Sequence, residues 1–186
     1  PHTGVMAYAA TIPKIPHAAL TVEDAMMLRR IHDRGDKIIL ELKMEARMVA
    51  DRYSRNVVAD LLGSEFPDEV VVLGGHIDSW DVGQGAQDDG GGCMAAWHAV
   101  KLIKDLGLQP RRTLRVVMWT NEENGGRGSK AYRDTHRAEL DKHIVGIESD
   151  GGVFKPQGFG FSGSADAMGI VSEIGQLLNG IDAGEI

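Results

Sequence analysis

The chain of 186 residues is poor in several features that would otherwise decide its function. Cys93 is the only cysteine, which excludes an intrachain disulfide and a zinc site built from thiolates. Lysine and arginine number 20 against 27 acidic residues, and this net charge of −7 argues against a nucleic-acid partner. No apolar run approaches the roughly 18 residues of a membrane span. We therefore expect neither nucleic acid nor a membrane as a partner.

The remaining composition is that of a globular protein, with 42% hydrophobic and 25% charged residues. Three short apolar runs, 70–75, 114–119 and 144–147, are typical of buried strands in a largely parallel sheet. Helix-forming segments alternate with them, so the pattern predicts an α/β fold with a central sheet. The expected helices are 21–34, 93–104, 129–140 and 165–178, the further strands are 38–45, 57–59 and 158–161, and a turn is expected at 66–68.

Each of the three apolar runs ends in side chains that bind metal ions. His76 follows the first run, Glu122 and Glu123 follow the second, and Asp150 follows the third. Because ligands of parallel sheets collect beyond the carboxyl ends of the strands, we expect these four residues to converge. Imidazole together with carboxylates suits a borderline divalent ion, and zinc is the first candidate.

A glycine-rich loop, 83–92, lies between the first two runs and adds Asp88 and Asp89 to the same crevice. A two-metal hydrolase needs terminal ligands for each ion, a bridging carboxylate and a general base. His76 and Asp150 suit one ion, Glu123 suits the other, and Asp88 suits the bridge.

Two neighbouring acids remain for supporting roles. Asp78 lies two residues after His76, on the same side of an extended chain, where it is expected to accept the other ring N–H. Glu122 and Glu123 are adjacent and so point in different directions, which suits one as general base and one as ligand. Trp80 is the one aromatic residue expected at the rim of the pocket, as a substrate contact.

Simpler interpretations exist for each residue taken alone. A carboxylate after a strand is usually a helix cap or a solvated loop residue, and only the recurrence on three strands favours a metal. Gly83-x-Gly85-x-x-Asp88 is a broken dinucleotide fingerprint with an acid where pyrophosphate would lie. Cys93 and the six other histidines are expected to be packing or surface residues.

Four segments together resemble the co-catalytic zinc exopeptidases, which include aminopeptidases, carboxypeptidases and dipeptidases. The segments are GHIDSWDVGQGA at 75–86, DDGGG at 88–92, WTNEE at 119–123 and ESD at 148–150. The resemblance extends through 1–4, 15–16, 20–25 and 102–108, and so covers nearly the whole chain.

The resemblance implies a three-layer sandwich with a mostly parallel, mixed central sheet. It also implies a peptidase of dipeptides or short peptides that holds two Zn²⁺ ions. His76 and Asp150 would bind one zinc, Glu123 the other, and Asp88 would bridge them, while Glu122 would activate the metal-bridging water. A secreted, lysosomal or periplasmic location is implied as well.

The chain departs from the family pattern at both ends. The family's second zinc takes a further histidine from a later segment, and the chain stops at Ile186 before it. Residues 1–50 resemble the closing part of an apical protease-associated insertion, and 51–186 resemble a partial catalytic domain. We therefore expect a truncated, inactive fragment that binds at most one zinc tightly and that self-associates or forms a homodimer through exposed apolar surface.

Two other functions remain open. A glutaminyl cyclase-like enzyme uses a single zinc, although such a site does not need His76. A binding or scaffold relative of the same fold would hold no metal. The number of bound metal ions distinguishes these three possibilities.

Overall fold

The computed structural model describes residues 7–9, 11–45, 47, 49–80 and 83–186, which fall into two compact units, 1–52 and 53–186. The helix of the first unit is α1, Val22–Asp33. The hydroxyl of Thr21 accepts a hydrogen bond from the backbone N of Asp24 at 3.1 Å, which satisfies a donor that the helix leaves free. This confirms the helix start expected at Thr21.

The strand predicted over 38–45 is wrong. The segment is irregular, although its apolar and polar residues alternate with the period of a strand. A strand is stable only when its backbone pairs with a neighbour, and among the described residues none pairs with this segment. Alternation in the sequence does not supply that neighbour.

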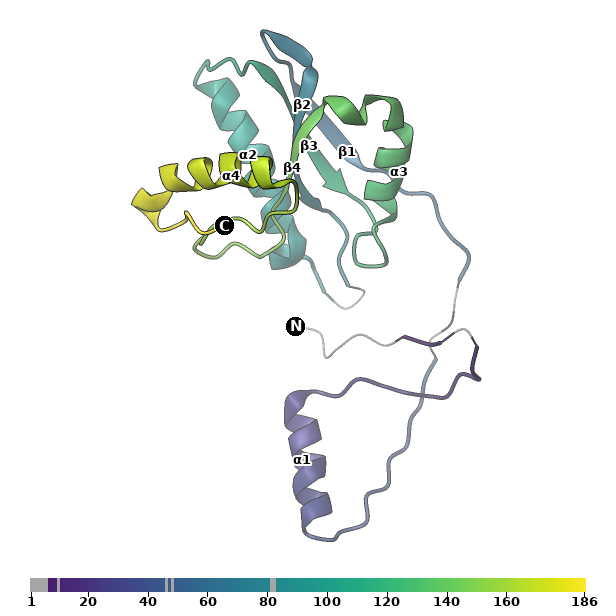
Figure 1. Cartoon of the computed structure of the whole chain (residues 1–186). Coiled ribbons are helices and arrows are strands. Elements are labelled where there is room, and N and C mark those ends of the chain that lie inside the picture. Colours follow the sequence, from purple (N-terminus) through teal and green to yellow (C-terminus); the bar gives the residue numbers. More distant parts are fainter. Residues whose placement is uncertain (1–6, 10, 46, 48, 81–82) are drawn as a thin grey trace. The chain divides into compact units, whose positions relative to one another are not determined.

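The second unit contains one four-stranded sheet in the order β1-β3-β2-β4 (Figure 1). Its strands are β1, Val57–Leu61; β2, Phe66–His76; β3, Arg112–Trp119; and β4, His143–Glu148. β2 is parallel to both β3 and β4, whereas β1 is antiparallel to β3. The expectation of a mostly parallel, mixed sheet is therefore confirmed.

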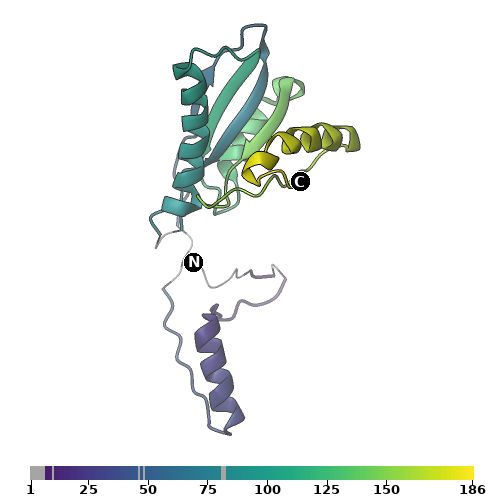
Figure 2. The ribbon, with the colours of Figure 1, turned by 90° about the vertical axis from the view of Figure 1, so that its left-hand side faces the viewer.

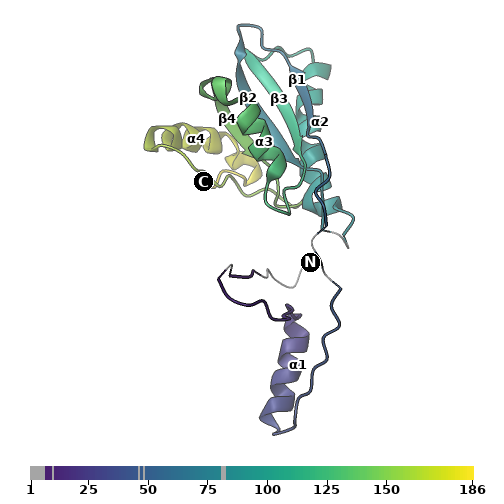
Figure 3. The ribbon, with the colours of Figure 1, turned by 90° about the vertical axis from the view of Figure 1, so that its right-hand side faces the viewer.

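Helices cover both faces of this sheet. α2, Gly91–Asp105, runs along one face, and α3, Arg127–Thr135, lies on the other (Figures 2 and 3). The chain steps from β2 to β3 on one side and then returns across β2 to β4, so two crossovers of the same hand place their helices on opposite faces. The three-layer α/β arrangement is confirmed.

The core lies between β2, β3 and the two helices. Val70, Val72, Val117 and Tyr132 form a buried cluster against which Trp119 packs. Burial of such side chains is the main favourable contribution to folding. The cluster thus joins the two central strands, β2 and β3, to α3.

Two helix and strand boundaries differ from those predicted. Phe66 already belongs to β2, so the turn predicted at 66–68 is wrong, and the pairing with β3 is instead irregular between Phe66 and Val70. The helix expected to run to residue 140 ends at Thr135, and a 3₁₀ turn, Arg137–Lys142, follows.

The last part of the chain contains α4, Ala165–Leu177, which confirms the helix expected there. The hydroxyl of Ser164 caps it by accepting from the backbone N of Ala167 at 3.2 Å. The strand predicted over 158–161 is wrong, because only Gly158 makes a single bridge, to Glu185. No helix of the described residues is long and apolar enough to cross a membrane.

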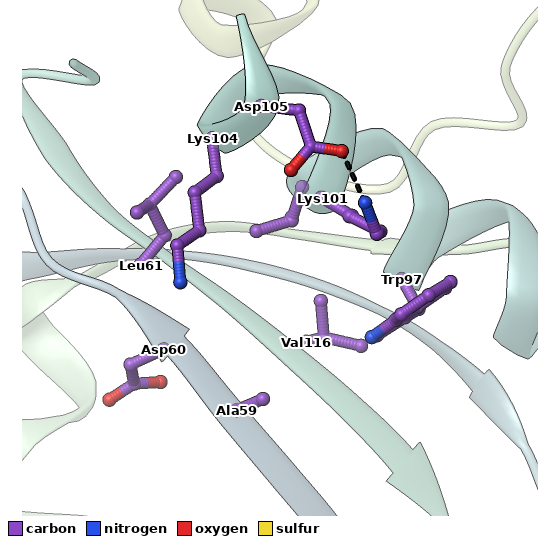
Figure 4. A pocket seen from close by; sticks show the side chains of 9 residues that line it. Ala59, Asp60, Leu61, Trp97, Lys101, Lys104, Asp105 and Val116 are labelled. Carbon is purple, nitrogen blue, oxygen red and sulfur yellow. Dashed lines mark hydrogen bonds and ion pairs between the residues drawn. The ribbon is translucent and has the colours of Figure 1, made fainter. Parts of the chain in front are cut away.

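A groove of about 350 Å³ lies between β1 and the carboxyl-terminal half of α2 (Figure 4). It is lined by residues 59–61, by Val116 and by α2 side chains that include Trp97 and Lys104. The candidate ligands lie elsewhere, at the amino-terminal end of α2, so this groove is separate from the site described next.

Candidate metal centre

The strand register brings the predicted ligands to one edge of the sheet. His76, the last residue of β2, pairs with Trp119, the last residue of β3. Gly74 pairs with Glu148, the last residue of β4. The loops that follow β3 and β4 therefore begin beside His76, as expected for parallel strands.

Three of the predicted ligands meet at the imidazole of His76. Its Nε2 lies 3.0 Å from Oδ1 of Asp88 and 3.3 Å from Oδ1 of Asp150. One ligand atom from each residue lies within 4.8 Å of the others. The His76 side chain is 1% exposed, whereas those of Asp88 and Asp150 are 53% and 47% exposed. The histidine of the cluster is therefore buried, and its two carboxylates are open to solvent.

The hydrogen bond on the other side of the ring shows why these residues suit a cation. Nδ1 of His76 lies 3.0 Å from the carbonyl oxygen of Asp78, which can only accept, so Nδ1 carries a proton. In the neutral ring, Nε2 then presents a lone pair to the two carboxylates of Asp88 and Asp150. A lone pair facing two anions requires either a proton or a metal ion between them.

The electrostatics of His76 agree with this geometry. Burial disfavours the charged imidazole, but the Asp78 carbonyl and the charges of Asp150, Asp89 and Asp78 outweigh it and raise the pKa of His76. The surroundings therefore stabilise positive charge at this ring. A divalent ion bound at Nε2 would supply such a charge.

The role predicted for the Asp78 carboxylate needs a correction. Its Oδ1 lies 3.7 Å from Nδ1 of His76, too far for a hydrogen bond, and the backbone carbonyl of Asp78 holds the ring instead. The carboxylate accepts from the backbone N of Glu122 at 2.9 Å and from that of Glu123 at 3.3 Å. Asp78 thus links the histidine to the loop that carries both glutamates.

Glu123 lies outside the three-ligand cluster but interacts electrostatically with two of its members, Asp88 and His76. Its Oε1 is buried and has no hydrogen-bond partner among the described residues. Burial and the charges of Asp88, Glu122 and Asp78 raise the pKa of Glu123, and His76 opposes the shift. A buried, unpartnered carboxylate oxygen that also feels the charge of Asp88 fits a second cation shared by these two residues.

Two predicted site residues remain, Glu122 and Trp80. Glu122 is half-buried in the same loop as Glu123, and its charge is one cause of the Glu123 pKa shift. Trp80 lies four residues beyond the end of β2 and is 39% exposed. Its substrate contact stays a prediction.

Asp89 is a supporting residue for which the sequence predicted no separate role. Its side chain is fully buried, and it accepts from the backbone N of His76 and from that of Gly92, both at 2.9 Å. It thereby joins the end of β2 to the start of α2. The available signal was its place two residues before the start of α2, where free backbone N–H groups can donate to a carboxylate.

Cys93 agrees with its expected packing role. It is 3% exposed, and its thiol donates to the carbonyl oxygen of His76 at 3.2 Å. Burial raises the pKa of Cys93 to about 11, with Asp89 and Glu148 contributing, so the reactive thiolate is disfavoured.

The position of the Asp78 carboxylate leads to a prediction. Asp78→Asn keeps the carbonyl that holds His76, but an amide can accept only one of the two bonds from Glu122 and Glu123. We expect metal affinity to fall about 10–100-fold without loss of the fold. Calorimetric zinc titration measures this, with the exposed Asp166→Asn on α4 as control; equal affinities for both variants would contradict it.

The chain is similar in sequence to known peptidases. It is 48% identical over 186 residues to carboxypeptidase Q of Mus musculus and to that of Homo sapiens. The match covers all of this chain but only 40% and 39% of those proteins. A probable leucine aminopeptidase 2 of Aspergillus oryzae is 32% identical over 127 residues, which are 67% of this chain and 25% of that protein.

A solved structure shares the fold. The crystal structure of a peptidase M28 precursor from Shewanella amazonensis SB2B superposes with a TM-score of 0.87 at 35% identity, over 98% of this chain and 41% of that one. The family model of peptidase family M28 matches residues 56–181, which contain the sheet and every ligand described above. The chain belongs to peptidase family M28.

Proposed function

We propose that this chain carries the core of a zinc-dependent exopeptidase site that cleaves dipeptides or short peptides. The observation that carries the proposal is the imidazole of His76. Its Nδ1 is held by a carbonyl oxygen, and its Nε2 faces the carboxylates of Asp88 and Asp150. The names of the similar proteins, carboxypeptidase Q and leucine aminopeptidase, support the exopeptidase class.

Two zinc ions fit the donors. His76 and Asp150 would hold the first ion, Glu123 the second, and Asp88 would lie between them as the shared ligand. Bound zinc supplies a Lewis acid for the scissile carbonyl and makes a water molecule acidic enough to react near neutral pH. The buried Oε1 of Glu123 supports the second position.

The residues of the chain would divide the remaining work. Glu122 would take the proton from the attacking water on its carboxylate and deliver it to the leaving amine. Asp78 would hold the backbone of Glu122 and Glu123, so that one carboxylate serves as base and the other as ligand. Trp80 would contact the substrate.

The chain spans about 40% of the length of the mouse relative. The activity proposed here is therefore that of a longer protein, of which this chain would supply part of the site. By the same family argument, residues 1–50 would belong to an apical insertion and residues 51–186 to part of the catalytic domain. A secreted, lysosomal or periplasmic location goes with this proposal.

A zinc titration of the 186-residue chain tests the proposal. The His76, Asp88 and Asp150 cluster offers three protein ligands, whereas Asp88 and Glu123 offer two, so we expect one tightly bound zinc and negligible dipeptide hydrolysis. His76→Ala should abolish tight binding, and the exposed His98→Ala should not. Light scattering in the same experiment would show whether the chain self-associates.

Two results of the zinc titration would contradict this expectation. Two tight sites with rapid turnover would mean that the second ion has a further ligand besides Asp88 and Glu123. Binding unaffected by His76→Ala would remove this cluster from the proposal. In a longer protein that contains this segment, two zinc ions would support the exopeptidase, one the cyclase-like enzyme, and none the scaffold.

A further inference from the structure

The loop that carries Glu122 and Glu123 is held at its base by a side chain from a distant part of the chain. Oδ1 of Asn56 accepts from the backbone N of Thr120 at 3.1 Å, and its Nδ2 donates to the carbonyl oxygen of Gly128 at 2.9 Å. Thr120 directly follows β3, and Gly128 lies in the first turn of α3. One amide therefore joins the two ends of the loop.

A third hydrogen bond closes the arrangement. The backbone N of Gly128 donates to the carbonyl oxygen of Thr120 at 3.0 Å. Asn56, Thr120 and Gly128 thus bind one another in a ring, which we call the loop clamp. The hydroxyl of Ser54 adds a contact of 2.8 Å to the hydroxyl of Thr120. Because the ring lies at the junction of β3 and α3, it sets where the intervening residues begin and end.

Only an amide of this length satisfies the loop clamp. The backbone N of Thr120 can only donate and the carbonyl of Gly128 can only accept, so the side chain at position 56 must offer one acceptor and one donor. Aspartate has the same size but no donor when ionised. Gly128 has no room for a side chain, since a Cβ there would lie 2.4 Å from Oδ1 of Asn56 and 2.4 Å from the carbonyl oxygen of Thr120.

The loop inside the clamp needs such support. Asn121 adopts a φ of 60°, in the left-handed region that costs energy for a residue other than glycine. Its carbonyl oxygen accepts from the backbone N of Gly126 at 2.9 Å, so the loop turns back on itself between the two clamp residues. The Asp78 carboxylate holds its middle, at Glu122 and Glu123.

We propose that Asn56 is a positioning residue for the site: by joining Thr120 to Gly128 it places Glu122 and Glu123 against the His76, Asp88 and Asp150 cluster. This inference rests on the proposed function, which it deepens by naming what orients the base and the second-site ligand. Asn56 touches no candidate ligand, and its effect passes through the backbone of the loop.

Amide hydrogen exchange of the metal-free chain tests the clamp without any appeal to activity. In Asn56→Ala we expect the amides of Glu122 and Glu123 to exchange at least about 10-fold faster, since the loop loses both side-chain hydrogen bonds of Asn56 at its base. The amide of His76, held by Asp89, should keep its rate and thereby reports that the sheet is intact. Gly128→Ala should give the same pattern from the other side of the clamp.

Cobalt titration of the same variants supplies the link to the site. Asn56→Asp keeps the acceptor and removes the donor, and Asn124→Asp, exposed on the same loop, adds an equal charge without touching the clamp. We expect Asn56→Asp to speed the loop amides as Asn56→Ala does, and Asn124→Asp to leave them unchanged. Tight Co²⁺ binding at the His76 cluster should persist in both, while any weaker binding that depends on Glu123 should be lost only in Asn56→Asp.

Three outcomes decide the matter. Unchanged exchange at Glu122 and Glu123 in Asn56→Ala would overturn the inference, as would equal acceleration at His76, because Asn56 would then serve the whole sheet. Faster loop exchange with Co²⁺ binding unaffected by Glu123→Gln would support the clamp and count against the proposed function.

Discussion

Glu122→Gln should lower kcat by about 10²–10⁴-fold while the zinc content stays near that of the unmodified protein. The substitution keeps the backbone N of residue 122, which donates a hydrogen bond to the Asp78 carboxylate, so the loop retains its position. It removes only the carboxylate that would receive the proton. Turnover of a dipeptide, measured beside metal analysis in a longer protein that contains this segment, gives both quantities.

The neighbouring substitution separates base from ligand. Glu123→Gln should lose bound metal as well as activity, because Oε1 of Glu123 would no longer be an anionic ligand. Glu173→Gln on the exposed side of α4 serves as the control for loss of one negative charge. Full activity of Glu122→Gln would remove Glu122 from the mechanism, and metal loss in both variants would show that the two glutamates share one role.

Gly92→Ala should destabilise the fold by about 3 kcal/mol or more, because overpacking at this point cannot relax. A Cβ at Gly92 would lie 1.7 Å from the carbonyl oxygen of Ser149 and 2.3 Å from Oδ1 of Asp89. The first is backbone at the end of β4, and the second is the fully buried carboxylate that holds the backbone of His76. Moving either one displaces the metal cluster.

Urea unfolding of the 186-residue chain measures this effect. Gly146→Ala in β4 is the matched control, since a Cβ there meets nothing within 4 Å, and we expect it to change stability by less than about 1 kcal/mol. Zinc affinity should fall in Gly92→Ala and persist in Gly146→Ala. If the two variants unfold at the same urea concentration, the close approach of α2 to the end of β4 does not limit stability.

The sequence by itself determined the parts of this protein that depend on neighbouring residues. Apolar runs that end in His76, Glu122 and Asp150 predicted parallel strands with ligands at one edge, because strand direction alone brings those ends together. Thr21 marked a helix start through a hydrogen bond that spans three residues. The donor types in turn predicted a divalent metal.

The tertiary structure decided what depends on residues far apart in the chain. The 38–45 segment has a strand pattern but no partner, so alternation was insufficient. Asp78 holds backbone 44 residues away and Asn56 holds backbone 64 and 72 residues away. A carboxylate or an amide binds whichever backbone groups the fold presents, and no local pattern encodes that choice, because it follows only from the packing of β1, β3 and α3 around the loop.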